Sequence, residues 1–278
     1  MHYQEHPAPA SLSRHILCCW YLDNPQASQQ PQVIYPDGHC ELIVHFAAPP
    51  FVRIKHDEWQ QQSRTLFVAQ QRAAIQLRSP TGLNCFGIRL QPAASAVLAG
   101  SVLPALTDQI VDLEGLAPSF AQSFRRLAPS SSVDDLPNEL VQFLEQQFLS
   151  YPIDRSVEQA IAILKARNGN YRIETLAAEV NLGLRTLQTR VQALIGLSAK
   201  EFAQLMRLQA AIKLLDSQPS SLAALAGDTG FADQAHATRA LQDRLGITPF
   251  RLLKALQDDL NADNTVQLAA AFVRGHGD

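Results

Sequence analysis

The stretch SLAALAGDTGFADQAHATRALQDRLGITPFRLLK, residues 221–254, has the pattern of a helix-turn-helix. An apolar-periodic segment over 222–228 is followed by a turn and then by a second amphipathic segment over 233–245. Asp233 stands where it can cap the second segment. The stretch therefore predicts two short helices, the second with an apolar inner face and a polar outer face.

The stretch ETLAAEVNLGLRTLQTRVQALIG, residues 174–196, repeats this pattern about fifty residues earlier. Residues 173–177 align with residues 222–226. In the second helices, Leu187 aligns with Ala237, Thr189 with Arg239 and Val191 with Leu241. The chain therefore contains two copies of one unit, and helices are predicted over 173–180 and 184–195 in the first copy.

A helix predicted over 198–217 joins the two units. Its 20 residues span about 30 Å at about 1.5 Å per residue, while successive major grooves on one face of DNA lie about 34 Å apart. Its apolar residues recur every three or four positions, which predicts a stiff link packed between the units. These residues are Phe202, Leu205, Leu208, Ile212 and Leu215. Further helices are predicted over 156–166 and 248–257.

Residues on the outer faces of the second helices have side chains that can contact base edges. Arginine pairs with guanine, glutamine with adenine, and threonine and alanine contact the thymine methyl group. The candidates in the first unit are Arg185, Thr186, Gln188, Thr189 and Arg190. The candidates in the second unit are Gln234, Ala235, His236, Thr238 and Arg239.

The charge distribution agrees with this interpretation, although the whole chain has a net charge of −3. Residues 1–154 contain 9 basic and 14 acidic residues, a net charge of −5. Residues 155–256 contain 13 basic and 8 acidic residues, a net charge of +5. The positive charge is concentrated where the paired helices are predicted, as expected for a surface that meets DNA phosphates.

Residues 155–256 resemble the DNA-binding domain of the AraC/XylS family of transcription regulators. The second unit carries the resemblance through Gly230, Phe231, Asp233, Gln234, His236, Arg239, Gly246, Thr248 and Pro249. The resemblance implies sequence-specific binding of double-stranded DNA, activation or repression of nearby promoters, and RNA polymerase as a further partner. By position it assigns groove-facing roles to Arg185, Gln188, Thr189, Ala235, His236 and Arg239.

The sequence departs from the family pattern at several positions. Thr189 and Val191 replace the usual Arg and Phe, and Gly183 replaces the usual Ser at the helix start. Neighbouring Arg190 is a partial substitute for the missing Arg. Ala237 and Leu241 replace aromatic core residues in the second unit, which predicts looser packing there.

The first third of the chain is rich in short β-like runs separated by Pro, Gly, Asp and Asn turns. These runs cover residues 18–22, 32–36, 40–46, 51–54, 65–69, 74–78 and 85–90. The stretches YPDGHCELIVHF (35–46) and 86–116 resemble the N-terminal domain of a subset of AraC/XylS regulators, which implies a cupin-like β-barrel. Helical spacing follows over 94–103 and 134–149.

We therefore expect an α+β protein with a β-rich, cupin-like N-terminal domain and an all-α domain with two helix-turn-helix units. Residues 1–150 form a sensing or dimerising domain, residues 151–260 bind DNA, and residues 261–278 form a tail. An effector or a partner acts at the first domain. The apolar face of 134–149 is the best candidate for a homodimer contact.

No cofactor, metal site or catalytic group is expected. The four cysteines, Cys18, Cys19, Cys40 and Cys85, lack metal-ligand spacing and are interpreted as reduced core thiols. In 40–46, Cys40 starts an apolar face taken to point inward, which leaves His39 and His45 on a solvated face. No membrane-spanning or leader segment is apparent, so the cytoplasm is the expected location.

Two other functions are compatible with parts of this pattern. The first domain could be an enzyme tethered to DNA, which would require a reactive constellation that the sequence does not reveal. Alternatively, the protein could be a ligand-free interaction module that acts through another protein. Turnover by residues 1–150 would support the former, and a footprint independent of any ligand would support the latter.

Overall fold

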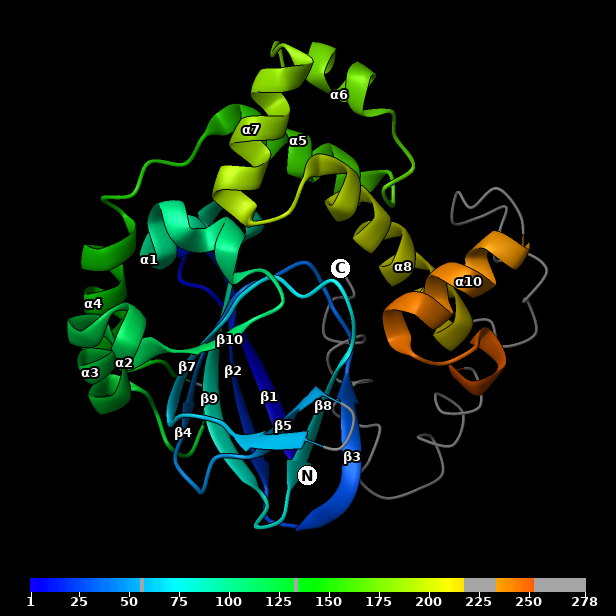
Figure 1. The fold of residues 1–278 in the computed structure, drawn as a ribbon. Helices are drawn as coiled ribbons and strands as arrows, with labels where there is room; N and C mark the ends of the chain where they lie inside the picture. The colour runs from blue at the N-terminus through cyan, green and yellow to red at the C-terminus, as the bar shows by residue number, and fades with distance from the viewer. Residues whose placement is uncertain (56–57, 133–134, 218–233, 253–278) are drawn as a thin grey trace.

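The computed structural model describes residues 1–55, 58–132, 135–217 and 234–252. A β-rich N-terminal domain is followed by an all-helical domain (Figure 1), which confirms the expected α+β class. The predicted helix over 222–228, its neighbour Asp233, the end of the helix over 248–257 and the tail over 261–278 lie outside the described residues.

The N-terminal domain contains two antiparallel sheets. One sheet has six strands in the order β1-β2-β9-β4-β7-β10, and the other has four in the order β3-β8-β5-β6. The six-stranded sheet is formed by β1 His2–Pro7, β2 Ile16–Asn24, β9 Leu83–Leu90, β4 Glu41–His45, β7 Thr65–Val68 and β10 Ile110–Asp112. The four-stranded sheet is formed by β3 Ser28–Ile34, β8 Ile75–Ser79, β5 Phe51–Lys55 and β6 Glu58–Gln61.

The six-stranded sheet is buried on both faces. Alternate residues of a strand point to opposite faces, and in β2 the residues Cys19 and Tyr21 join the core beneath the helices, whereas Trp20 and Leu22 join a second cluster on the other face. That second face looks toward the four-stranded sheet, because residues of both sheets line one cavity. Burial on both faces explains why β7, TLFV, is apolar along nearly all its length.

The expectation that His39 and His45 are solvated is wrong. Cys40, Leu42 and Val44 do share a buried face, but that face packs under the helices on the outside of the sheet. His39 and His45 are only 5% and 4% exposed, because their face of β4 looks into the space between the sheets. An apolar face on a strand identifies one buried side but does not show that the other side is exposed to solvent.

Short helices cover the outer face of the six-stranded sheet (Figure 1). They are η1 Ala10–Leu12, η2 Pro92–Ala94, α1 Ala96–Ala99, η3 Gly100–Leu106, α2 Leu113–Leu116, α3 Pro118–Leu127 and α4 Asn138–Phe148. In α4, Leu140, Leu144 and Phe148 are fully buried in the N-terminal core, and the Phe148 ring centroid lies 6.2 Å from that of Phe120. The apolar face proposed for a homodimer contact is therefore occupied within the chain, which overturns the reason for placing a dimer there.

The structure contains elements that the sequence patterns did not predict: β1, β6, β10, α2 and α3. Strand β1 is largely polar and pairs with β2 along its whole length, from His2 opposite Asp23 to Pro7 opposite Cys18. Helix α3 did have a signal, because Pro118 occupies its first turn and Phe120 and Phe124 are spaced to share its buried face. Whether a polar segment such as β1 forms a strand depends on the neighbouring strand with which it pairs, so its composition alone does not predict it.

The C-terminal domain begins after the link over 149–154. Its described helices are α5 Arg155–Ala166, α6 Ile173–Glu179, α7 Leu184–Ile195, α8 Ala199–Ser217 and α10 Gln234–Leu245. Asp154 caps α5 by accepting hydrogen bonds from the backbone N–H groups of Ser156 and Val157. None of the helices in the described ranges has the length and apolar composition that crossing a bilayer requires.

Helix α8 runs through the middle of this domain. It starts one residue later than predicted because Ser198 serves as its cap: the Ser198 hydroxyl accepts from the Glu201 N–H at 3.2 Å, and Glu201 accepts from the Ser198 N–H at 2.9 Å. The five apolar residues predicted to pack the link are all buried. The helix has 19 residues and a length of about 28 Å.

The turn between α5 and α6 packs directly on α8 at Gly169. This glycine has φ 69°, and a Cβ added there would lie 1.8 Å from the carbonyl oxygen of Ala203. We expect Gly169→Ala to lower the free energy of unfolding by about 2 kcal/mol or more, from left-handed backbone strain and displacement of α8. Urea unfolding followed by circular dichroism measures this effect.

Gly115→Ala is the control, because Gly115 lies in α2 with no atom within 4 Å of an added Cβ. We expect this variant to be as stable as the parent or slightly more stable. Equal stability of the two variants would contradict the close packing of Gly169 on α8.

Candidate nucleic-acid interface and interior cavity

Helix α7 presents the predicted outer face of the first unit to solvent. Leu187 and Val191 are fully buried, together with Leu176 of α6, so the inner face of the unit is as predicted. All five candidate residues of this helix are exposed: Arg185, Thr186, Gln188, Thr189 and Arg190. Gly183 occupies the cap position without a side-chain hydrogen bond, so the N–H groups of the first turn have no side-chain partner from this residue.

Arg190 already has a partner on the protein. Its Nη1 lies 3.2 Å from Oδ2 of Asp154, the carboxylate that caps α5. This ion pair holds the guanidinium toward α5, beside the outer face of α7. Arg190 therefore substitutes for an arginine at position 189 only if it leaves Asp154.

Helix α10 carries the candidates of the second unit. Ala235 and Arg239 are exposed and Thr238 is half-buried. The Arg239 Nε donates to the carbonyl oxygen of Ala235 at 3.3 Å, so its side chain lies back along the helix surface. Gln234 and His236 belong to the same helix, but their side chains lie outside what the structure describes.

The two helices end in the same way and on the same neighbour. Gly196 after α7 and Gly246 after α10 have φ 83° and 70°, the left-handed conformation that terminates a helix. The Thr107 hydroxyl donates to the carbonyl oxygen of Gly196 at 2.8 Å, and the Ala74 N–H donates to that of Arg244 at 2.7 Å. The N-terminal domain therefore holds the C-terminal ends of both helices, while the first turn of α7 and, in α10, Ala235 remain exposed.

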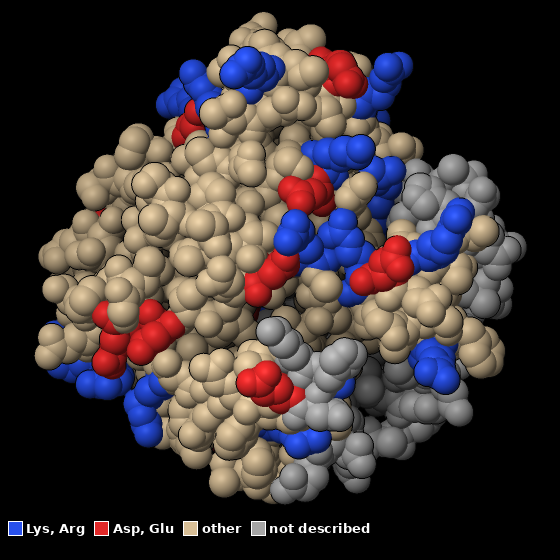
Figure 2. Space-filling model, in the orientation of Figure 1, with Lys and Arg blue, Asp and Glu red and all other residues tan. Residues whose placement is uncertain are grey.

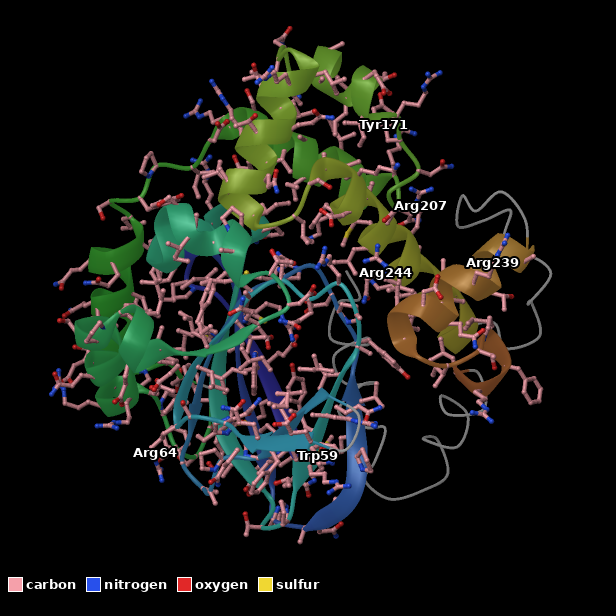
Figure 3. All side chains as sticks on the ribbon, in the orientation of Figure 1. Trp59, Arg64, Tyr171, Arg207, Arg239 and Arg244 are labelled. Carbon is pink, nitrogen blue, oxygen red and sulfur yellow. The ribbon has the colours of Figure 1, made fainter. Side chains whose placement is uncertain are left out.

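A cleft of about 360 Å³ between α8 and α10 is lined by Asp243 and by three arginines, which Figure 3 labels: Arg207, Arg239 and Arg244. The Arg207 Nε is buried without a hydrogen-bond partner, and burial lowers the pKa of this residue. Arg244 donates to Gln204 Oε1 at 2.9 Å. Sequence reasoning missed Arg207 and Arg244; the surplus of arginine in 155–256 was the available signal.

Basic side chains gather over α8 and beside α10 in Figure 2, with acidic residues among them. In the same view the surface over α1 and α4 is largely uncharged, whereas side chains of both signs lie over α2 and α3. In this view one group of basic side chains therefore lies over the helices that join and form the paired units.

A cavity lies between the two sheets of the N-terminal domain. The centre of a water-sized molecule can occupy about 80 Å³ of it. Its wall is mostly apolar and includes Trp20, Leu22, Ile43, Leu77 and Leu83. Polar side chains stand at intervals along it: Asp37, His39, Glu41, His45 and Gln62. The strand that the sequence singled out, β4, supplies several of these groups.

One end of the cavity adjoins a buried charge cluster around Arg89. The guanidinium is fully buried and lies 2.9 Å from Glu41, 3.1 Å from Glu5 and 3.3 Å from Asp37. Glu41 also accepts a hydrogen bond from the Trp20 indole N–H at 3.2 Å. Burial raises the pKa of Glu41 to about 7, although Arg89 acts in the opposite direction.

His45 is neutral at physiological pH, because burial lowers its pKa to about 4. Its Nε2 lies 3.2 Å from the side-chain oxygen of Gln62. If Nε2 carries the proton that this contact requires, Nδ1 is an acceptor, and Nδ1 is buried without a partner.

The cysteines are buried and unpaired, as predicted. Burial raises the pKa of Cys18 and of Cys40 to about 12, so these thiols are protonated. Within the described ranges, no three His, Cys, Asp or Glu side chains are grouped closely enough to hold a metal ion.

Comparison with known families gives two matches along the chain. A helix-turn-helix domain family matches residues 176–255, and a domain of unknown function, DUF6597, matches residues 4–112. No curated protein sequence gives a significant match.

The chain is similar to several solved structures. One is ToxT from Vibrio cholerae, with 12% identity and a TM-score of 0.45 over 91% of this chain and 97% of that chain. A probable AraC family transcriptional regulator from Rhodopseudomonas palustris has 28% identity and a TM-score of 0.34, over 37% of this chain and 98% of that chain. The C-terminal domain of AraT, a response regulator from Geobacillus stearothermophilus, has 18% identity and a TM-score of 0.35, over 36% and 85%.

The Glu41 carboxyl makes the stability of the protein depend on pH. Its raised pKa means that the folded protein retains a proton which the unfolded chain releases, so folding is favoured at low pH and stability falls as pH rises from about 4.5 to about 7. We expect the free energy of unfolding of the parent to fall relative to that of Glu41→Gln by about 1–3 kcal/mol between pH 5 and pH 8.

Urea unfolding of both proteins across this pH range measures the difference between their free energies of unfolding. The contributions of groups that titrate alike in both proteins cancel in this difference. A difference that stays constant, or that grows in favour of the parent as pH rises, would contradict the burial of a protonated Glu41.

Proposed function

We infer that this chain is a DNA-binding transcription regulator of the AraC/XylS family. We propose that it reads two successive major grooves of one DNA site with α7 and α10. The observation that carries the proposal is that the C-terminal ends of two equivalent helices are both docked, while the candidate residues of α7 and, in α10, Ala235 and Arg239 are exposed. The length of α8, about 28 Å, approaches the roughly 34 Å between successive grooves.

In this proposal Arg185, Gln188 and Thr189 contact bases in one groove, and Ala235, His236 and Arg239 do so in the next. The arginines pair with guanine, Gln188 pairs with adenine, and the threonine and alanine contact thymine methyl groups. Thr186, Arg190, Gln234 and Thr238 flank these positions and contact the backbone or the base edges. Arg207 and Arg244 add positive charge beside α10.

We further propose that the cavity of the N-terminal domain binds an effector. The wall is apolar, His45 is neutral and its Nδ1 is an unpartnered acceptor, so the cavity suits a compact uncharged molecule with one hydroxyl or N–H group. Charged ligands would lose their hydration without a free counter-ion from His45.

The loop over 35–38 links this cavity to the DNA-binding domain. Tyr35 lines the cavity and also belongs to the core of the C-terminal domain. The carbonyl oxygen of Pro36 accepts a hydrogen bond from Gln209 of α8, and Gly38 lies against Phe202 and Met206. An occupant of the cavity would press on this loop and so change how the two recognition helices are presented.

A regulator of this family does not require catalysis, and the DNA-tethered enzyme is not proposed. The ligand-free interaction module differs from the present proposal in having no effector and in acting through another protein. DNA binding that responds to cavity occupancy would separate the two.

Selection of bound duplexes from a random library by the full-length protein tests the reading of bases. We expect Arg239→Ala to relax the preference at one position of one half-site, and Arg185→Ala to do so in the other half-site, with a loss of about 1–3 kcal/mol each. Arg125→Ala is the control, because Arg125 is exposed on α3 and pairs with Glu114. Uniform weakening over all sequences would mean that the arginine contacts phosphate, and no change would contradict its role.

The cavity is tested with two ligands of one shape, p-cresol and p-xylene, of which only the first donates a hydrogen bond. We expect p-cresol to raise the Tm of the full-length protein with increasing concentration and p-xylene to raise it less. Ile43→Phe fills the cavity and should abolish the shift, whereas Ile54→Phe, on a residue 47% exposed, should not. Equal shifts with both ligands, or none, would overturn the proposed ligand chemistry.

A further inference from the structure

Two segments of the N-terminal domain, 69–74 and 107–109, are hydrogen-bonded to each other, and together we call them the interdomain bridge. The Asp108 N–H donates to the carbonyl oxygen of Gln70 at 2.8 Å, and the Ala69 N–H donates to that of Gln109 at 3.1 Å. The two segments are therefore joined through the backbone before any side chain is considered.

The side chains of Arg72 and Asp108 reinforce the bridge. The Arg72 backbone N–H donates to Oδ1 of Asp108 at 2.7 Å, and the Arg72 Nε donates to Oδ2 at 2.7 Å. Asp108 holds this position with φ 63°, a conformation that costs free energy for a residue with a Cβ. The carboxylate thus binds both the backbone and the side chain of the opposite segment.

Each segment of the bridge holds one of the two helix-turn-helix units. Segment 107–109 holds the first unit through the hydrogen bond from Thr107 to Gly196. Segment 69–74 holds the second through the Ala74 N–H on the carbonyl oxygen of Arg244 and through the Arg244 Nη1 on that of Arg72 at 2.9 Å. In the alignment of the two units Gly196 corresponds to Gly246. The residue contacted in the second unit, Arg244, lies two positions before Gly246.

The bridge also reaches the helix that connects the units. The Arg72 Nη1 lies 3.2 Å from Oε1 of Glu201, the residue that completes the cap of α8. Burial raises the pKa of Glu201, but hydrogen bonds from Ser198 and Arg72 outweigh it and lower the pKa, so the carboxylate stays charged. One arginine therefore joins the bridge to the start of α8.

These contacts close a ring that runs from α7 through α8 and α10 and back through the bridge. A single helix between two units leaves them free to bend and twist about its ends, whereas a closed ring removes that freedom. We infer that the interdomain bridge determines which spacing between two half-sites the protein accepts, with Arg72 and Asp108 as the positioning residues. The inference rests on the proposed reading of two grooves by one chain.

DNA geometry makes the spacing a sensitive readout. One added base pair moves a half-site by about 3.4 Å along the axis and by about 34° around it. A rigid pair of helices meets such a displaced site poorly, whereas a pair joined by α8 alone can follow it. The spacing preference therefore reports the stiffness of the ring and not the strength of either half.

The experiment measures binding of full-length protein to duplexes whose half-sites are moved apart or together by one and two base pairs. We expect the parent to bind one spacing at least about 10-fold more tightly than its neighbours. Asp108→Gly, which removes the carboxylate and relieves the positive φ, and Arg72→Met should reduce this preference to about 2-fold. Arg72→Lys should restore part of it, and affinity for a single half-site should be unchanged in all three.

Arg14→Met is the matched control. Arg14 forms another ion pair between the domains, with Glu158 of α5, and its side chain is 48% exposed against 47% for Arg72. Because this pair reaches α5, which lies outside both helix-turn-helix units, the variant should keep the spacing preference of the parent.

An unchanged spacing profile in Asp108→Gly and Arg72→Met would overturn the inference. So would weaker binding to a single half-site, which would mean that these residues support the fold and not the spacing. If the parent itself gains no affinity from a second half-site, the proposed reading of two grooves fails, and that result is distinct from a failure of the bridge.

Discussion

The packing of α8 is the constraint on which the rest of the structure depends. This helix is covered on one side by the two helix-turn-helix units and on another by the N-terminal domain, where Gly38 lies against Phe202, Leu205 and Met206. Gly38 has φ 85° and no side chain. Its loop therefore lies closer to the helix than a loop with a side chain at this position could. Because one helix belongs to both interfaces, neither domain can move without affecting it.

The burial of the six-stranded sheet on both faces has a different consequence. One face is occupied by the helices α1 to α4 and supplies the apolar core, while the other encloses the cavity and its polar groups. Burial of Arg89 is tolerated because three carboxylates surround it, and a buried cation without partners would be strongly destabilising. Burial, to which the neighbouring Asp37 adds, raises the pKa of Glu41 to about 7.

Charge is thus used for separate purposes in the two domains. In the N-terminal domain the charge cluster around Arg89 is buried and paired, and it stabilises one arrangement of strands. In the C-terminal domain Arg185 and Arg239 are exposed, and the Nε of Arg207 is buried without a hydrogen-bond partner. The overall charge of −3 conceals this division, and only the distribution along the chain reveals it.

The sequence by itself determined the helices of the first unit, the apolar residues of α8, the burial of the cysteines and the exposure of the candidate residues of α7. These follow from local periodicity, because a helix with one apolar stripe exposes its opposite side wherever it packs. Only the tertiary structure decided that His39 and His45 face a cavity, that the apolar face of α4 is filled from within and that Arg190 pairs with Asp154. Each of these depends on which distant segment covers a face, and the contacts from Ala74 and Thr107 to the two helix ends join residues more than eighty positions apart, which no local pattern records.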